Sequence, residues 1–138
     1  MNKKNINVLI IDDEESILTS LRRLLEDKGY TVTTYSNPEQ AIDYVRNNLV
    51  HIALIDITMP RVDGMSALGM IKDISGLTQI IIMSAYATTE RVIASLESGA
   101  NDFLLKPFDS LDHVVSIVEE SEKKLARWQD VLKHLGAL

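Results

Sequence analysis

The sequence alternates short apolar segments with longer stretches in which apolar residues recur every three or four positions, and this alternation constrains the fold most strongly. The short segments have the length of β-strands, and the longer stretches have the periodicity of a helix with one buried face. Parallel strands need crossover connections, which are usually helices, so the alternation predicts an α/β protein with a parallel sheet covered on both faces. The expected strands are residues 6–11, 31–35, 52–55, 79–83 and 103–105.

Capping residues give the expected helix boundaries. Gly29 and Gly99 stand where the first and fourth helices should end, because glycine favours the left-handed conformation of a C-terminal cap. Asn37-Pro38 supplies an N-cap followed by proline at the first helical position, and Asp109 or Ser110 is expected to cap the fifth helix. The apolar positions that mark the five helices are Ile17, Leu18, Leu21, Leu24 and Leu25, then Ala41, Ile42 and Val45, then Met65, Leu68 and Ile71, then Val92, Ile93 and Leu96, and finally Leu111, Val114, Val115 and Val118.

The composition excludes several classes of protein. A length of 138 residues is that of one domain, and the absence of cysteine excludes a disulfide scaffold and a thiolate metal site. The net charge of −6 disfavours direct binding to nucleic acid. No apolar run approaches the ~20 residues of a membrane span, and the first residues do not resemble a secretion signal. A cytoplasmic protein without a membrane anchor is therefore expected.

Chemically useful side chains directly follow four of the five expected strands. Asp12 and Asp13 follow the first strand, Asp56 the third, Ser84 the fourth and Lys106 the fifth. In a doubly wound, flavodoxin-like sheet of order 2-1-3-4-5, the first and third strands are neighbours, so the three carboxylates would gather where such sheets bind ligands. Carboxylates that repel one another favour a shared cation, and oxygen ligands suit Mg²⁺. A cation, a lysine and a hydroxyl around a carboxylate are the groups that hold a phosphoryl group.

The same residues form a pattern that resembles the receiver domain of bacterial two-component response regulators. The resemblance covers roughly residues 6–121, in the order that the family shows. It implies a Mg²⁺-dependent phosphoacceptor switch that assists its own phosphorylation and dephosphorylation rather than an enzyme with a separate substrate. The phosphoryl group would come from a sensor histidine kinase or a phosphotransfer protein, and the switch would control an output. The motifs that carry the resemblance are Asp12-Asp13, Asp56-Ile57-Thr58-Met59-Pro60 with Asp63-Gly64, Ser84-Ala85, and Lys106-Pro107 at the end of the segment from residue 99.

The resemblance also implies a role for each site residue. Asp56 is the expected phosphoacceptor. Asp13, Asp56 and the backbone carbonyl of Thr58 would ligate Mg²⁺, and Asp12 would act on the ion largely through water. Lys106 would pair with the phosphoryl oxygens.

Further residues match positions that, in the family, change conformation on phosphorylation or control the access of water. Ser84 occupies the place of the switch hydroxyl, and Phe103 occupies that of the switch aromatic residue. Thr58 and Tyr86 occupy the two rim positions past which water reaches the acyl phosphate. Lys106-Pro107 resembles the family's cis-bonded junction, an isomer that is plausible only before proline.

Three alternatives use some of the same residues. A phosphohydrolase with an aspartyl nucleophile would also need Asp, Mg²⁺ and Lys, but such enzymes usually carry an acid two residues after the nucleophile, where this chain has Thr58. A flavodoxin-like electron carrier shares the fold, but the acidic residues 12–15 would repel a flavin phosphate. A degenerate receiver would lack an active-site residue, and none is missing. Titration with a small phosphodonor separates these functions.

The C-terminal residues extend beyond the resemblance. We divide the chain into a receiver domain, residues 1–121, and a helical extension of the fifth helix, residues 122–138, which would act as a linker or a dimerisation helix. No Gly or Pro interrupts this helix before Gly136, so it should run on beyond the sheet. Two pairs at i, i+4 spacing favour a continuous helix across the boundary. These pairs are Glu119–Lys123 and Glu120–Lys124.

Apolar residues of this helix recur at alternating steps of three and four, which is the spacing of a heptad seam. We expect the seam to be exposed on a monomer and to form a parallel two-helix homodimer that passes the phosphorylation state to a following output. The alternative is a tail that folds back onto its own domain. The expected seam is Val118, Ser121, Leu125, Trp128, Leu132 and Leu135, of which the last four form the dimer contact proper.

Overall fold

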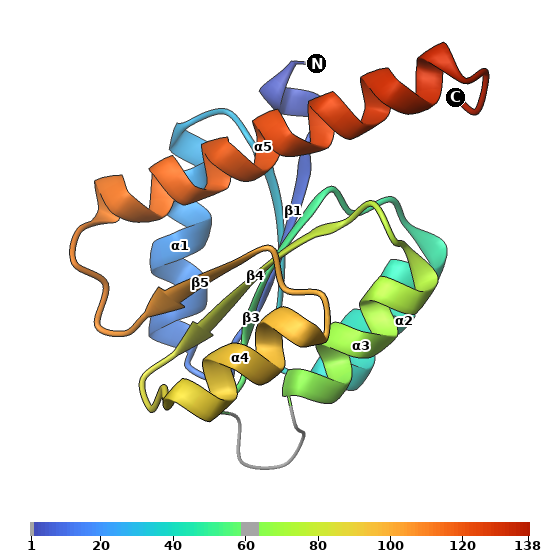
Figure 1. Ribbon diagram of the computed structural model, residues 1–138. Helices are drawn as coiled ribbons and strands as arrows, with labels where there is room; N and C mark the ends of the chain where they lie inside the picture. The colour runs from blue at the N-terminus through green and yellow to red at the C-terminus, as the bar shows by residue number, and fades with distance from the viewer. Residues whose placement is uncertain (1, 59–63) are drawn as a thin grey trace.

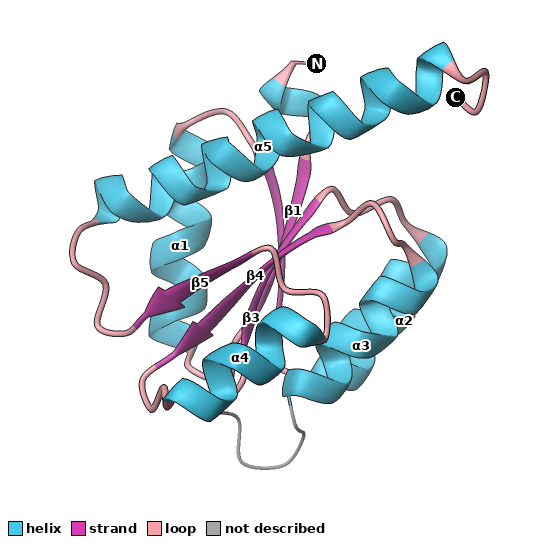
Figure 2. Cartoon of the chain, viewed as in Figure 1, coloured by secondary structure: helices cyan, strands magenta, loops and turns pink. Residues whose placement is uncertain are grey.

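Five parallel strands form the sheet at the centre of the computed structural model, which describes residues 2–58 and 64–138. The strand order is β2-β1-β3-β4-β5, so the predicted doubly wound, flavodoxin-like arrangement is confirmed. Figure 2 shows the strands running side by side between two layers of helices. The strands are β1 (Asn7–Ile11), β2 (Thr31–Tyr35), β3 (Ile52–Asp56), β4 (Gln79–Ser84) and β5 (Asp102–Leu105).

Two groups of helices cover the two faces of this sheet. Helices α1 and α5 lie on one face, and α2, α3 and α4 lie on the other (Figure 1). A short 3-10 turn, η1 (Lys3–Asn5), precedes β1. Among the described helices, none combines the length and apolarity that crossing a membrane requires. The helices are α1 (Glu15–Asp27), α2 (Pro38–Asn47), α3 (Gly64–Ile74), α4 (Thr89–Glu97) and α5 (Leu111–His134).

The central strands are apolar throughout because both of their faces are covered. In β1, Val8 and Ile10 point into the core beneath α1 and α5, whereas Leu9 and Ile11 point into the core beneath α2 and α3. Successive side chains of a strand point to opposite faces, so an unbroken apolar run fills two cores at once. This packing fixes the strand register and therefore aligns the carboxyl ends of β1, β3 and β4, where the polar residues lie.

The helix caps act largely as the sequence predicts. The Asn37 side chain accepts a hydrogen bond from the N–H of Glu39, and Pro38 is the first residue of α2. Of the two candidates before α5, Ser110 is the cap, and its hydroxyl accepts the N–H of His113. Gly99 follows α4 with φ at +107°, a backbone conformation that residues with a Cβ rarely adopt.

Helix α4 is the most exposed of the helices in the described chain. Its apolar residues Val92, Ile93 and Leu96 are 37%, 49% and 69% exposed, and Ser95 is its one buried side chain. The Ser95 hydroxyl donates to the sulfur of Met65 in α3 at 3.3 Å. The apolar periodicity thus identified a helix, but the apolar face of that helix is not core.

Helix α5 runs without a break through residue 134, so the predicted extension of the last helix is confirmed (Figure 1). The expected exposed seam is wrong in its first half, because Val118, Ser121 and Leu125 are buried against the chain's own domain. Trp128 and Leu135 remain exposed at 51% and 76%. The exposed apolar surface of a monomer therefore begins at Trp128 and not at Val118.

The ion pairs at the start of this extension also differ from the expectation. Neither Glu119–Lys123 nor Glu120–Lys124 comes within ion-pair distance in the structure. Glu119 instead binds Lys3 of the N-terminal turn at 2.9 Å. The fold brings the N-terminal turn beside α5, and for Glu119 this tertiary partner has displaced the local one.

Candidate functional site

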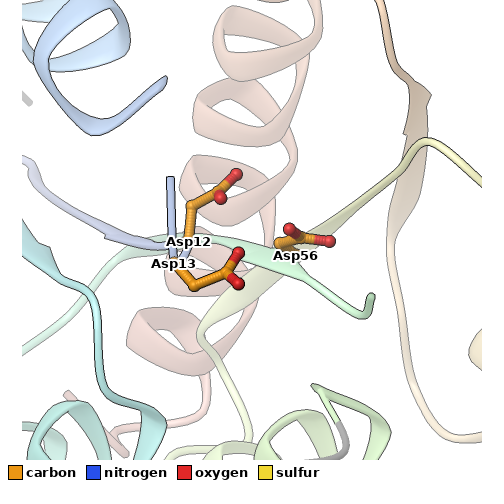
Figure 3. A group of neighbouring side chains, drawn as sticks. All are labelled: Asp12, Asp13 and Asp56. Atoms are coloured by element: carbon orange, nitrogen blue, oxygen red, sulfur yellow. The ribbon is translucent and has the colours of Figure 1, made fainter. Parts of the chain in front are cut away.

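Three carboxylates converge at the carboxyl ends of β1 and β3. Asp12 and Asp13 directly follow β1, and Asp56 is the last residue of β3, the neighbouring strand. One carboxylate oxygen from each lies within 4.8 Å of the other two (Figure 3). Asp12 and Asp56 are buried, at 0% and 2% exposure, whereas Asp13 is open to solvent. The predicted clustering of these three residues is therefore present in the structure.

Lys106 supplies the positive charge of the site. It follows β5, and its backbone N–H donates to the carbonyl of Ser84 on β4 at 2.8 Å. Its ammonium donates to Oδ2 of Asp12 and, at 3.2 Å, to Oδ2 of Asp56. The bond between Lys106 and Pro107 is cis, as expected from the sequence. One buried lysine thus joins two buried carboxylates from two different strands.

Burial and the neighbouring charges shift the pKa values of Asp12 and Lys106 in opposite directions. Burial raises the pKa of the Asp12 carboxyl above its ordinary value, although the hydrogen bond from Lys106 opposes the shift. Burial lowers the pKa of Lys106, but the hydrogen bond and charge of Asp12, together with the charge of Asp56, outweigh it and hold that pKa above its ordinary value. Lys106 therefore stays protonated, with a surplus of negative charge around it.

Thr58 makes a contact that the sequence analysis did not foresee. Its backbone N–H and its hydroxyl both donate to Oδ1 of Asp56, at 2.8 Å and 2.6 Å. Asp56 therefore has one oxygen held by Thr58 and the other facing Lys106. A hydroxyl residue two positions after an aspartate is the available signal, since aspartate side chains commonly accept hydrogen bonds from the backbone two residues on.

Ser84, Tyr86 and Phe103 come from β4, the segment after it and β5, and none of them makes a hydrogen bond to Asp56. Ser84 ends β4, is fully buried, and accepts the N–H of Tyr86 with its hydroxyl at 3.1 Å. Tyr86 is 75% exposed. Phe103, on β5, is half-buried and packs against the core beneath α2 and α3. The polar ends of four strands thus meet at one edge of the sheet.

The close approach of α3 to the segment after β3 explains why the Asp63-Gly64 motif carries glycine at position 64. A Cβ built at this position would lie 2.5 Å from the backbone oxygen of Asp56 and 2.6 Å from Cα of Ile57. Only glycine lets α3 begin so close to the segment that carries the acidic residue. Met59, Pro60 and Asp63 belong to the same motif and lie outside the described residues.

The donor set of the cluster fits a hard divalent cation. All three side chains offer carboxylate oxygens, and Mg²⁺ prefers oxygen ligands. Lys106 balances one of the three negative charges, which leaves the cluster acidic. The exposed Asp13 provides access from solvent, as an ion that keeps part of its water shell requires.

Comparisons with known proteins agree with this geometry. The family model described as "Response regulator receiver domain" matches residues 8–119. The chain is 34% identical over 121 residues to the transcriptional regulatory protein ZraR of Escherichia coli strain K12, and the match covers 88% of this chain but 27% of ZraR.

Solved structures give the same result. A CheY-like response regulator receiver domain from Methanospirillum hungatei JF-1 superposes with a TM-score of 0.85 at 25% identity, covering 88% of this chain and 97% of that one. The beryllofluoride-activated NtrC4 receiver domain dimer superposes with a TM-score of 0.81 at 28% identity, covering 86% and 98%. The order of the strands, the acidic edge and these matches lead to one conclusion. The chain belongs to the family of two-component response regulator receiver domains.

Proposed function

We propose that Asp56 accepts a phosphoryl group from a phosphohistidine of a sensor kinase or a phosphotransfer protein. The observation that carries this proposal is the position of Oδ2 of Asp56, which faces the Lys106 ammonium while Thr58 holds Oδ1. Oδ2 attacks the phosphorus atom in line, the bond between phosphorus and the histidine nitrogen breaks, and the electron pair stays on the imidazole. The product is an acyl phosphate on Asp56. We further propose a cytoplasmic setting, which the family implies.

The neighbouring residues have distinct roles in this transfer. Lys106 neutralises charge on the phosphoryl oxygens and keeps the group aligned. Asp13, Asp56 and the backbone carbonyl of Thr58 would hold Mg²⁺, with Asp12 acting through water. Bound there, Mg²⁺ would supply further neutralisation of the charge that builds up in the transition state.

In this proposal, Ser84 and Phe103 transmit the conformational change that follows phosphorylation. In the present structure the Ser84 hydroxyl accepts the N–H of Tyr86, so it is free to donate its own proton to a phosphoryl oxygen. Movement of Ser84 toward the phosphate makes room for the half-buried Phe103 to turn inward. The change is a shift between two states, and the free energy that drives it is the difference in phosphate contacts between them.

The extension of α5 is the proposed route to the output. We keep the division into a receiver domain, residues 1–121, and a helical extension, residues 122–138, and propose that the extension pairs with a second copy of the chain. Support comes from the exposed stripe after Leu125 and from NtrC4, whose receiver domain is described as a dimer. The chain spans about a quarter of ZraR, so the nature of any output lies outside it.

Phosphorylation by acetyl phosphate tests the assignment of the acceptor. With Mg²⁺ present, intact-mass analysis should show one added phosphate on the wild-type chain and none on Asp56→Asn, which keeps the shape but removes the charged nucleophile. Asp73→Asn, a change of an exposed aspartate on α3, is the matched control and should be phosphorylated normally. Lys106→Ala and Asp13→Ala should slow the reaction. Uptake of phosphate by Asp56→Asn at the wild-type rate would refute the proposal.

A further inference from the structure

Three neighbouring cations of α5 make no ion pair within the described chain. The i, i+4 spacing would pair Lys123 with Glu119 and Lys124 with Glu120. In the structure, Glu119 forms its ion pair with Lys3, and Glu120 forms none with a described residue. Lys123, Lys124 and Arg127 consequently make no ion pair and no side-chain hydrogen bond with any described residue. These three cations lie close together on a chain whose net charge is −6.

These cations line one groove between α5 and the start of β5. The groove has a volume of about 330 Å³, which is within the range of sites for small molecules. It lies at the amino-terminal end of β5, whereas Lys106 and the acidic cluster lie at the carboxyl ends of the strands. The groove is therefore separate from the proposed phosphoacceptor site. Its lining consists of Asn101, Asp102, Glu120, Ser121, Lys123, Lys124 and Arg127.

The Ser121 hydroxyl is a further hydrogen-bond donor that lines this groove. The residue is only 4% exposed, it lines the groove, and its hydroxyl has no hydrogen-bond partner among the described residues. The hydroxyl reaches the surface of the groove and its proton is not donated within the described chain, so it can donate to an anionic ligand that enters the groove.

Lys72 adds to the positive potential beside this groove. Its ammonium donates to the carbonyl of Thr78 at 2.8 Å, and its stem packs against Gly99, just before the groove-lining Asn101. Burial and the charge of Lys124 together lower the pKa of Lys72. An anion in the groove would relieve the repulsion between these two lysines.

We propose that this groove binds the phosphate group of a small molecule. A dianionic phosphate offers several acceptor oxygens, which match the ammonium and guanidinium donors and the Ser121 hydroxyl. Asp102 and Glu120 line the same groove and can accept hydrogen bonds from hydroxyl or amino groups on the rest of a ligand. The shared chemistry is phosphate, and its source is either inorganic phosphate or a phosphate ester.

Amide chemical-shift titration of the full chain tests this inference. The titrations use inorganic phosphate, adenosine monophosphate and adenosine in turn, at constant ionic strength and with EDTA to exclude Mg²⁺. Saturable shifts should appear at Asn101, Ser121 and Lys124 with both phosphates and not with adenosine. Tighter binding of the monophosphate identifies an ester as the ligand, and equal binding identifies free phosphate.

Substitutions distinguish a specific binding site from nonspecific electrostatic attraction of anions. Lys124→Gln and Arg127→Gln should each weaken binding about tenfold, and Ser121→Ala should weaken it severalfold. Lys133→Gln, on the last turn of the same helix and outside this groove, should leave the affinity unchanged within twofold. The inference is overturned if the shifts do not saturate, if Lys133→Gln weakens binding equally, or if the shifts centre on Lys106. Circular dichroism of each variant verifies that the fold is retained.

Discussion

Thr58 and Asp56 are joined by two hydrogen bonds to one oxygen: the N–H and the hydroxyl of Thr58 donate to Oδ1 of Asp56 at 2.8 Å and 2.6 Å. A carboxylate oxygen has two lone pairs, so both are engaged before any ligand arrives. A cation that approaches Oδ1 must displace a donor, and the hydroxyl is the donor that can rotate away. The Thr58 side chain should therefore compete with Mg²⁺ for Asp56.

Replacement of Thr58 by valine should tighten the binding of Mg²⁺. Valine keeps the shape of threonine but cannot donate, so the cation no longer competes with a hydroxyl. A hydrogen bond to a charged group contributes about 1.5–3 kcal/mol, less what water restores, so the dissociation constant should fall about three- to tenfold. Isothermal titration calorimetry with MgCl₂ measures the change. Thr58→Ser keeps the hydroxyl and should behave like wild type, and equal affinities for the valine and serine variants would exclude the competition.

The position of this site could be predicted from the sequence because it depends on local patterns. Alternating strands and helices predict a parallel sheet, and in the flavodoxin-like order of that sheet β1 lies beside β3, which brings Asp12 and Asp13 to Asp56. The bond from the Thr58 hydroxyl depends on one side-chain rotamer, which residue spacing does not specify.

The errors concern contacts between distant parts of the chain. Lys3 binds Glu119 across 116 positions, so the spacing of charges along one helix could not reveal it. Leu125 has the heptad spacing of a dimer seam, but it is buried at 2% exposure against its own domain. Spacing indicates which helix face is apolar, whereas the neighbour that covers the face is decided by tertiary packing.

The lifetime of the proposed acyl phosphate should be long. Thr58 has neither a base nor an amide to orient water. Tyr86 occupies the other position that the resemblance assigns to the rim, and its exposed ring can obstruct the approach of water. Tyr86→Ala should therefore speed the loss of phosphate, which intact-mass analysis follows after the phosphodonor is removed. Leu49→Ala replaces a similarly exposed apolar residue that is distant from Tyr86 in sequence, and it should leave the rate of phosphate loss unchanged. Equal decay rates for Tyr86→Ala and wild type would remove this explanation.

Acid should destabilise the fold through His51. Its Nδ1 accepts the N–H of Asn7 at 2.9 Å, and burial lowers the pKa of the ring below its ordinary value. The unfolded chain therefore binds a proton that the folded chain does not. The stability that this group provides is complete above its unfolded pKa and is lost as the pH falls below it. The free energy of unfolding should decrease between about pH 7.5 and 5.5, the range in which histidine titrates.

Replacement of His51 by a residue that does not titrate separates its contribution to the pH dependence of stability from those of the other titratable groups. His51→Asn offers a carbonyl acceptor to Asn7 but does not titrate, so its unfolding free energy should depend less on pH than that of wild type. His113→Asn, at an exposed position, is the control and should retain the wild-type dependence. Urea denaturation at each pH measures the difference. A His51→Asn profile parallel to that of wild type would contradict the assignment.

The extension of α5 should form the dimer through a seam shifted from the heptad pattern. After the buried Leu125, the exposed apolar residues of the helix and its C-cap follow one another at steps of three and four, which is the spacing of a short coiled-coil contact. They are Trp128, Val131 and Leu135, at 51%, 49% and 76% exposure.

Sedimentation equilibrium of the full chain tests this seam. The wild type should be dimeric at tens of micromolar, because burying Trp128 and its apolar neighbours removes exposed apolar surface from water. Trp128→Lys and Leu135→Lys should each shift the chain to monomer without unfolding it, since both side chains are exposed in one copy. Lys133→Gln, an exposed residue on the opposite side of the helix from this stripe, should remain dimeric. If the wild type is a monomer both with and without acetyl phosphate, the exposed stripe does not pair two copies of this chain.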